Sequence, residues 1–244
     1  MADPAIAAIA GWGHGPAAWE PLAGTGLEFA ARALPGLAPG DSVAPADCTL
    51  TAAAERLAGD WDLLLGWSLG GLAAVEAIRQ GIARARGLVL IGTPATFLAG
   101  ADHPAGLDPE VLADFRTGLA AAPHKTLRRF YALQFQGDTA PRATWAGGRD
   151  HFLATAAEPA VLAGWLEVLA AADLRAEPPA LPLPVLALHG AADPIVDPAA
   201  ADFLAGCSPA GQAQLVAGAG HAPHIAHAEE TGKRIAEFAH QLPR

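Results

Sequence analysis

Short, nearly continuous apolar runs recur along the chain, and each is followed by Gly, Pro or Asp. The runs cover residues 5–10, 63–65, 87–91, 185–189 and, more weakly, 213–216. Apolar runs without polar alternation are typical of parallel strands that are covered on both faces. We therefore predict that these five runs form the strands of a central sheet.

Helical spacing lies between the predicted strands. Apolar residues after position 68 recur at intervals of three and four up to Ile78, and Gly81 stands where a helix would be capped. Residues 235–242 have the pattern of a last amphipathic helix. Strands that alternate with helices predict an α/β fold with a mostly parallel, doubly wound sheet flanked by helices.

The middle of the chain breaks this alternation. Residues 95–178 contain helical patterns at 110–119, 125–135 and 161–172, and no strand pattern stands out. A proline-rich connector, residues 178–184, then leads back to a strand. We predict one domain, residues 1–244, in which residues 95–178 form an all-helical cap over an active site.

Composition narrows the class of protein. The chain has 244 residues, of which 52% are hydrophobic and 16% charged, so it is expected to fold compactly. Its net charge of −10 argues against a nucleic-acid binder. No signal peptide or membrane span is recognised, and Cys48 and Cys207 do not suggest a disulfide scaffold. A cytoplasmic monomer without membrane partners is expected.

Gly66-Trp67-Ser68-Leu69-Gly70 carries the strongest chemical signal. This Gly-x-Ser-x-Gly motif follows a predicted strand and opens a predicted helix. That setting is the nucleophile elbow of α/β hydrolases, in which a sharp turn exposes the serine hydroxyl and needs small neighbours. Ser68 is therefore the candidate nucleophile. An idle serine in a glycine-rich turn is the alternative.

A serine nucleophile needs a base and an acid that orients the base, and in this fold the order along the chain is Ser, acid, His. Asp193 follows a predicted strand and is the favoured acid, with Asp197 as its rival. His221 lies in a glycine-rich loop after the last predicted strand and is the candidate base. A metal site built from His189, Asp193 and the histidines at 221, 224 and 227 is a weaker alternative, so no metal or cofactor is expected.

An oxyanion hole should accompany such a nucleophile. One donor is expected to be the backbone N–H of Leu69, the residue after Ser68, and the other to come from the loop after the first strand. That loop is Ala10-Gly11-Trp12-Gly13-His14-Gly15, and we expect the N–H of Trp12 to point at the developing oxyanion.

These motifs, with Gly220-His221-Ala222-Pro223 and several cap segments, resemble the pimeloyl-[acyl-carrier protein] methyl ester esterase family of biotin synthesis. The resemblance covers nearly the whole chain. It implies an α/β-hydrolase fold and hydrolysis of the methyl ester of a pimeloyl group held on acyl-carrier protein. By position it implies a triad of Ser68, Asp193 and His221, and oxyanion or substrate contacts from Trp12 and Leu69. The acyl contacts that it implies are Phe130, Tyr131, Ala132, Leu133 and Gln134.

Local charge in the cap agrees with a carrier protein as partner. Six Lys or Arg residues and one acid lie between positions 116 and 149. An acidic carrier would be steered to such a surface, although a solvated helix face gives the same pattern. The resemblance implies carrier contacts at Lys125, Arg129 and Arg142. A broad carboxylesterase for short-chain esters and a non-hydrolytic binding or lyase-like member of the fold are the alternatives.

Overall fold

A parallel sheet forms the centre of the computed structural model, which describes residues 5–154 and 157–243. Within these residues the sheet has six strands in the order β2-β1-β3-β4-β5-β6, and every neighbouring pair is parallel. The strands are β1 (Ile6–Ile9), β2 (Ala30–Arg32), β3 (Gly59–Trp67), β4 (Ala83–Ile91), β5 (Val185–Gly190) and β6 (Gly211–Val216).

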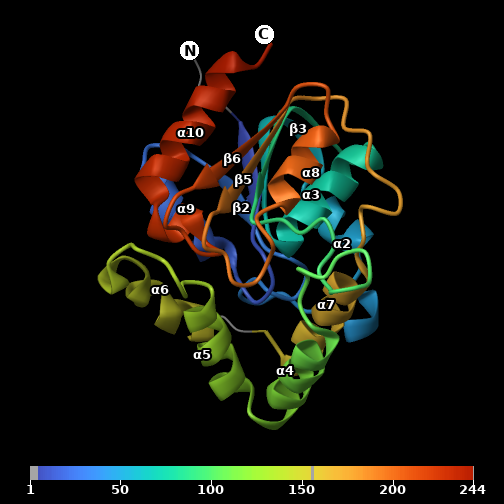
Figure 1. Ribbon diagram of the computed structural model, residues 1–244, viewed down its shortest axis with the longest axis vertical. Helices are drawn as coiled ribbons and strands as arrows, with labels where there is room; N and C mark the ends of the chain where they lie inside the picture. The colour runs from blue at the N-terminus through green and yellow to red at the C-terminus, as the bar shows by residue number, and fades with distance from the viewer. Residues whose placement is uncertain (1–4, 155–156, 244) are drawn as a thin grey trace.

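Helices cover both faces of this sheet, with the longer ones on opposite sides in Figure 1. One face carries α2 (Leu50–Glu55), α3 (Leu69–Arg79) and α8 (Ala200–Gly206). The other carries the short helices α1 (Glu20–Ala23) and α9 (Pro223–Ala226) and the long α10 (Ala228–Gln241). The predicted doubly wound α/β fold is confirmed.

Among the described residues, four helices fill the sequence between β4 and β5, a segment called here the cap. They are α4 (Pro109–Ala121), α5 (Pro123–Leu133), α6 (Arg142–Ala154) and α7 (Pro159–Ala171). In Figure 1 they lie at the end of the molecule opposite the two termini, where the carboxyl ends of the strands point. Helix α7 is joined to the core by two indole hydrogen bonds, from Trp165 Nε1 to the Pro35 carbonyl and from Trp12 Nε1 to the Leu162 carbonyl, both 2.9 Å.

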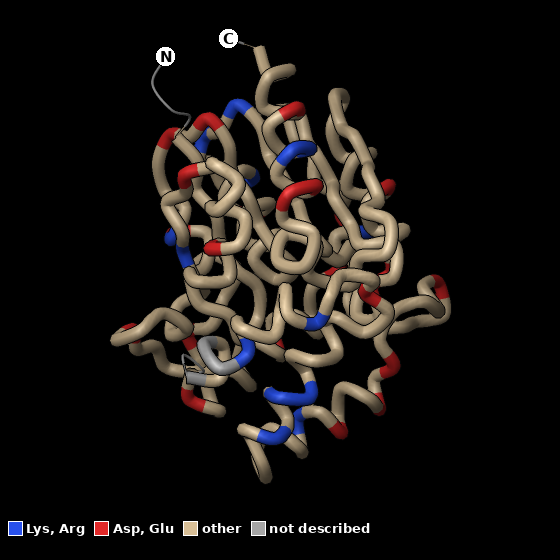
Figure 2. The backbone as a smooth tube through the Cα atoms, turned by 90° about the vertical axis from the view of Figure 1, so that its left-hand side faces the viewer, with Lys and Arg blue, Asp and Glu red and all other residues tan. Residues whose placement is uncertain are grey.

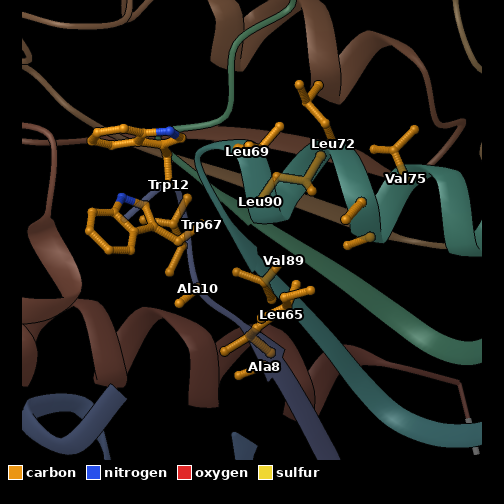
Figure 3. Close-up of a cluster of buried hydrophobic side chains, with 14 of the residues drawn as sticks. Ala8, Ala10, Trp12, Leu65, Trp67, Leu69, Leu72, Val75, Val89 and Leu90 are labelled. Atoms are coloured by element: carbon orange, nitrogen blue, oxygen red, sulfur yellow. The ribbon is translucent and has the colours of Figure 1, made fainter. Parts of the chain in front are cut away.

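The core lies on both faces of the sheet. Figure 3 shows Leu90 of β4 beside Leu72 and Val75 of α3, and these side chains are at most 1% exposed. Leu65 and Val89 are fully buried and point from the strands to the opposite face. Burying a side chain of this size contributes about 1.5–3 kcal/mol to stability. This packing fixes the angle at which α3 leaves the sheet, and therefore the place of the turn before it.

All five predicted strands are present, although β3 and β4 begin four residues before the apolar runs that predicted them. Their first residues are partly exposed and polar, as in Gly59-Asp60-Trp61-Asp62, so the pattern identified only the buried half. Strand β2 and helices α2, α6 and α8 were not predicted. Helix α6 contains Gly147 and Gly148, which weaken a helical pattern.

Candidate active site

Ser68 occupies the turn between β3 and α3. Its φ and ψ are 55° and −123°, and among the described residues it is the one non-glycine with positive φ. The main chain is held there by a hydrogen bond from the Ser68 N–H to the Ile91 carbonyl of the neighbouring strand, 2.8 Å long. A β-carbon in this region is strained, and such strain persists where the surroundings hold it, as at active sites.

Glycines make room for this turn. A Cβ on Gly66 would lie 2.5 Å from Gly71 Cα, and one on Gly70 would lie 2.5 Å from the Ile9 carbonyl oxygen. A Cβ on Gly71 would overlap the side chain of Thr93. The three glycines therefore allow α3 to approach β1 and β4 closely.

Asp193 lies in the loop after β5, and its carboxylate is fully buried. One oxygen, Oδ2, accepts hydrogen bonds from His221 Nδ1 at 2.7 Å and from His189 Nε2 at 2.9 Å. The other, Oδ1, accepts from the N–H groups of Ile195 and Val196 at 2.8 and 3.1 Å. From the sequence, His189 was a candidate only for the alternative metal site. In the structure it forms a hydrogen bond with Asp193.

These donors keep Asp193 ionised. Burial alone would raise the pKa of Asp193, but the charge of His221 and the hydrogen bonds from His189 and His221 outweigh burial and lower it well below its usual range. Asp197, the rival acid, instead accepts a hydrogen bond from the Ala199 N–H at 3.0 Å, as a turn aspartate does. The geometry thus favours Asp193 over Asp197 as the partner of His221.

His221 is held from several sides in the loop after β6. Its N–H donates to the Gln134 carbonyl of the cap at 2.8 Å, and its carbonyl accepts from Trp67 Nε1 at 3.0 Å. Gly92, at the end of β4, passes so close that a Cβ there would lie 3.3 Å from His221 Nδ1. The imidazole is only 2% exposed, and it lines the same cavity as Ser68.

The loop after β1 passes beside the serine. A Cβ on Gly11 would lie 3.0 Å from the Ser68 Cβ. Within the described residues, the backbone N–H groups of Trp12 and Leu69 donate to no other group. Figure 3 shows Trp12 and Trp67 beside the start of α3, next to Leu69. Two unpaired donors near one hydroxyl are the arrangement that stabilises an oxyanion.

An apolar cavity of about 80 Å³ opens at Ser68. The edge of Phe130 packs on Trp12 with ring centroids 4.9 Å apart, and Phe115 approaches Trp12 at 5.5 Å. Val111 and Leu133 are 52% and 37% exposed, so they form the rim between α4 and α5. The full lining is Trp12, Ser68, Phe97, Leu107, Val111, Leu112, Phe115, Phe130, Leu133, Leu166, Leu169, Pro194, Ile195 and His221.

Two of the five expected acyl contacts, Phe130 and Leu133, line this cavity, and three do not. Tyr131 turns away and donates its hydroxyl to the Trp145 carbonyl at 2.8 Å. Ala132 is exposed on the outer surface of α5. The Gln134 side chain is fully buried, with its amide 3.0–3.1 Å from the His14 ring. The helical period explains the positions of Tyr131 and Ala132, because only residues three or four apart share one face of α5. Gln134 lies just after the last residue of α5.

The expected carrier contacts lie on the outside of the cap. Lys125 and Arg129 are exposed and one turn apart on α5, and neither forms an ion pair within the described part of the chain. Arg142 is exposed at the start of α6, with its guanidinium 5.8 Å from the centre of the Trp145 ring. Figure 2 shows Lys and Arg gathered at the cap end of the molecule.

Two further histidines are buried beside the site. Burial lowers the pKa of His14 to about 3, although its hydrogen bond with Gln134 opposes the shift. Burial also lowers the pKa of His224, whose ring packs on Trp67 and Trp19 and has no hydrogen-bond partner in the described structure. Residues 5–154 and 157–243 contain no group of three or more His, Cys, Asp or Glu side chains placed to hold a metal ion.

Comparisons with known proteins agree with this geometry. A family model described as "Alpha/beta hydrolase family" matches residues 8–234. The pimeloyl-[acyl-carrier protein] methyl ester esterase of Aromatoleum aromaticum is 36% identical and covers 94% of this chain and 96% of its own. The protein of that name from Yersinia enterocolitica is 35% identical over 72% of this chain and 69% of its own.

Solved structures support the fold. An esterase from Exiguobacterium antarcticum has a TM-score of 0.85 at 16% identity, covering 99% of this chain and 94% of its own. A bromoperoxidase from Bacillus anthracis has a TM-score of 0.82 at 19% identity, covering 98% of this chain and 92% of its own.

None of the helices in the described residues is both long and apolar enough to cross a bilayer. The chain belongs to the α/β hydrolase family and, within it, to the family of pimeloyl-[acyl-carrier protein] methyl ester esterases.

Proposed function

We propose that this protein is a serine carboxylesterase in which Ser68, His221 and Asp193 form the catalytic triad. The observation that carries the proposal is the 2.7 Å bond from His221 Nδ1 to buried Asp193, beside the cavity that Ser68 also lines. With Nδ1 protonated and bound to Asp193, Nε2 is the basic nitrogen. That nitrogen takes the proton from the Ser68 hydroxyl as its oxygen attacks the ester carbonyl.

The reaction then follows the two steps of acyl transfer. The N–H groups of Trp12 and Leu69 stabilise the tetrahedral oxyanion, and each such donor contributes roughly 3–4 kcal/mol to the barrier difference. The alcohol leaves with the proton that His221 holds, and the acyl group stays on Ser68 Oγ. Water, deprotonated by His221, then releases the carboxylate and restores the serine.

The substrate we propose is the methyl ester of pimeloyl-[acyl-carrier protein], with methanol as the leaving group. Support comes from the names of the relatives and from the shape of the site. The ester carbonyl would lie at Ser68, and the apolar chain would run past Phe130 to the rim at Val111 and Leu133. The end of the chain that is joined to the carrier would leave the cavity there.

Charge beside the rim suits the carrier. Arg129 precedes Leu133 by one turn of α5 and Lys125 precedes Arg129 by another, so both positive charges follow the helix face that leads to the rim. The whole chain carries a net charge of −10, so this basic surface is local. An acidic carrier protein would be attracted to it and held with its acyl chain facing the cavity.

Measuring kcat/KM for methyl pimeloyl-carrier protein and for free dimethyl pimelate tests both parts of the proposal. Ser68→Ala should abolish hydrolysis of both esters. Reversing charge at Lys125, Arg129 and Arg142 together should lower kcat/KM for the carrier-linked ester by about 10-fold or more at low salt, and leave the free ester unchanged.

The matched control reverses exposed basic residues away from the cap, Arg84 and Lys233. This variant should behave as the wild type does with both esters. Equal kcat/KM values for the two esters in the wild type would exclude recognition of the carrier protein. The protein would then be a broad carboxylesterase. If the Ser68→Ala variant still hydrolyses the esters, the proposal that Ser68 is the nucleophile is refuted.

A further inference from the structure

We infer that Asp138, together with Gln134, is a positioning residue that aligns His221 with Asp193 and Ser68. The inference rests on the proposed function, since it concerns the base of that reaction. Both residues belong to the segment that follows α5, residues 134–139, called here the cap clamp. Each of them forms a hydrogen bond with residues 218–221, called here the histidine loop.

Two main-chain hydrogen bonds and one to a side-chain carboxylate join the cap clamp to the histidine loop. The Gln134 carbonyl accepts from the His221 N–H at 2.8 Å, and the Thr139 N–H donates to the Gly218 carbonyl at 2.8 Å. Between them, Asp138 Oδ2 accepts from the Gly220 N–H at 3.0 Å. A side chain of the cap, that of Asp138, therefore holds Gly220, and a main-chain carbonyl of the cap, that of Gln134, holds His221.

Asp138 is built into this position. Its side chain is 1% exposed, and Oδ1 accepts from the Ala140 N–H at 2.7 Å and from His227 Nε2 at 3.0 Å. No Lys or Arg pairs with it in the described part of the chain. Burying a carboxylate lowers the stability of the fold unless hydrogen bonds satisfy its oxygens. The donors to Asp138 come from the cap itself, the histidine loop and the residue before α10.

Gln134 also connects the cap to the loop after β1, which carries Trp12. Its side-chain amide lies 3.0–3.1 Å from the ring of His14, two residues after Trp12, while its carbonyl holds His221. One residue of the cap thus bonds to the loop that carries an oxyanion donor and to the loop that carries the base. Phe130, one turn earlier on α5, lines the acyl cavity.

A function follows from this connection. The cap helix that contacts the acyl chain also sets the position of His221, so the base is held in its working geometry by the cap. Misplacing a catalytic group by about 1 Å can cost 100-fold in rate. Asp138 touches neither substrate nor reacting atoms, so its removal should lower kcat and leave KM nearly unchanged.

The test compares Asp138→Asn with Asp41→Asn. Asp41 is the matched control because its carboxylate also accepts a loop N–H, that of Gly36 at 2.9 Å, but contacts nothing in the histidine loop. We expect kcat for dimethyl pimelate to fall about 10- to 100-fold in Asp138→Asn, with KM within about twofold, and to remain at the wild-type value in Asp41→Asn.

A second readout does not depend on hydrolysis. The Nδ1 proton of His221, bonded to Asp193, should give a far-downfield proton NMR signal that is assigned by its loss in Asp193→Asn. In Asp138→Asn this signal should shift or broaden, and in Asp41→Asn it should not. A wild-type chain without Ser68-dependent hydrolysis would overturn the proposed function, whereas the NMR signal would still test the alignment.

Should Asp138→Asn fail to fold, His227→Asn serves as the milder variant, because it removes one donor to Asp138 and leaves the Gly220 bond in place. We expect a smaller loss of kcat at unchanged KM and a displaced Nδ1 signal. A wild-type kcat together with an undisturbed signal, in whichever of these variants folds, would overturn the positioning role.

Discussion

Mild acid should destabilise this protein because of His14, and the size of the effect follows from its pKa. The His14 side chain is 4% exposed, and its pKa is lowered from 6.5 to about 3 in the folded state. Below pH 6.5 the unfolded chain takes up a proton that the folded chain refuses. Stability is therefore lost as the pH falls below about 6.5, and the loss continues down to about pH 3.

Each pH unit within that window costs about 1.4 kcal/mol. Between pH 7.5 and pH 5.0, His14 alone should therefore remove about 2 kcal/mol from the free energy of unfolding. The pKa of His224 is lowered in the same direction, so the total loss should be larger. The interval stays above the range in which carboxylates such as Asp193 titrate, which separates the two effects.

Equilibrium unfolding in urea at pH 7.5 and pH 5.0, followed by tryptophan fluorescence, measures the change. His14→Leu has no proton to take up, so its loss of stability between these pH values should be about 2 kcal/mol smaller than that of the wild type. Leu57→Ala is the control: it removes a fully buried side chain elsewhere and should lower stability equally at both pH values. An identical pH-dependent loss in wild type and His14→Leu would refute the reasoning.

Three further predictions concern the site. Gly92→Ala should lower kcat at least about 10-fold in an ester hydrolysis assay, because φ is +52° there and the new Cβ would press on the His221 ring; an unchanged kcat would contradict this contact. Gly70→Ala should lower the free energy of unfolding by about 1–3 kcal/mol or more, measured by urea titration, since its Cβ has no space beside β1. Phe130→Ala should shift the preference among methyl esters toward bulkier acyl groups, and an unaltered ranking of kcat/KM would place the acyl chain elsewhere.

Sequence pattern predicted the sheet and the site to different depths. Buried strands gave strong apolar runs, so β1 and β5 were identified nearly to the residue, whereas β2 is three residues long and only partly buried. Ser68 was predicted because the sharp turn of a nucleophile elbow needs glycines at neighbouring positions, and these glycines are visible in the sequence. The contact between His221 and Asp193 was expected from their order along the chain, and the structure brings the two side chains within 2.7 Å.

The rest depends on tertiary contacts that no local pattern encodes. Gln134 stands in a segment that resembles acyl contacts, yet it faces His14 because α5 turns it inward. Asp138 looked like one acid in a basic stretch, and its partners outside its own loop, Gly220 and His227, lie 82 and 89 residues away in sequence. A helical wheel drawn on the cap would have separated Phe130 and Leu133 from Ala132, which is a signal available from the sequence.

The two indole bonds of α7 have a consequence for protein engineering. Helices α4 to α7 follow one another between β4 and β5, which invites exchange of this segment between hydrolases or its expression as a fragment. Yet Trp165 donates to Pro35, and Leu162 accepts from Trp12, so one helix of the segment is bonded to loops of the sheet domain. A transplanted segment would leave these polar groups without partners on both sides of the junction. Chimeras should therefore exchange α4 to α6 and retain α7 with the host.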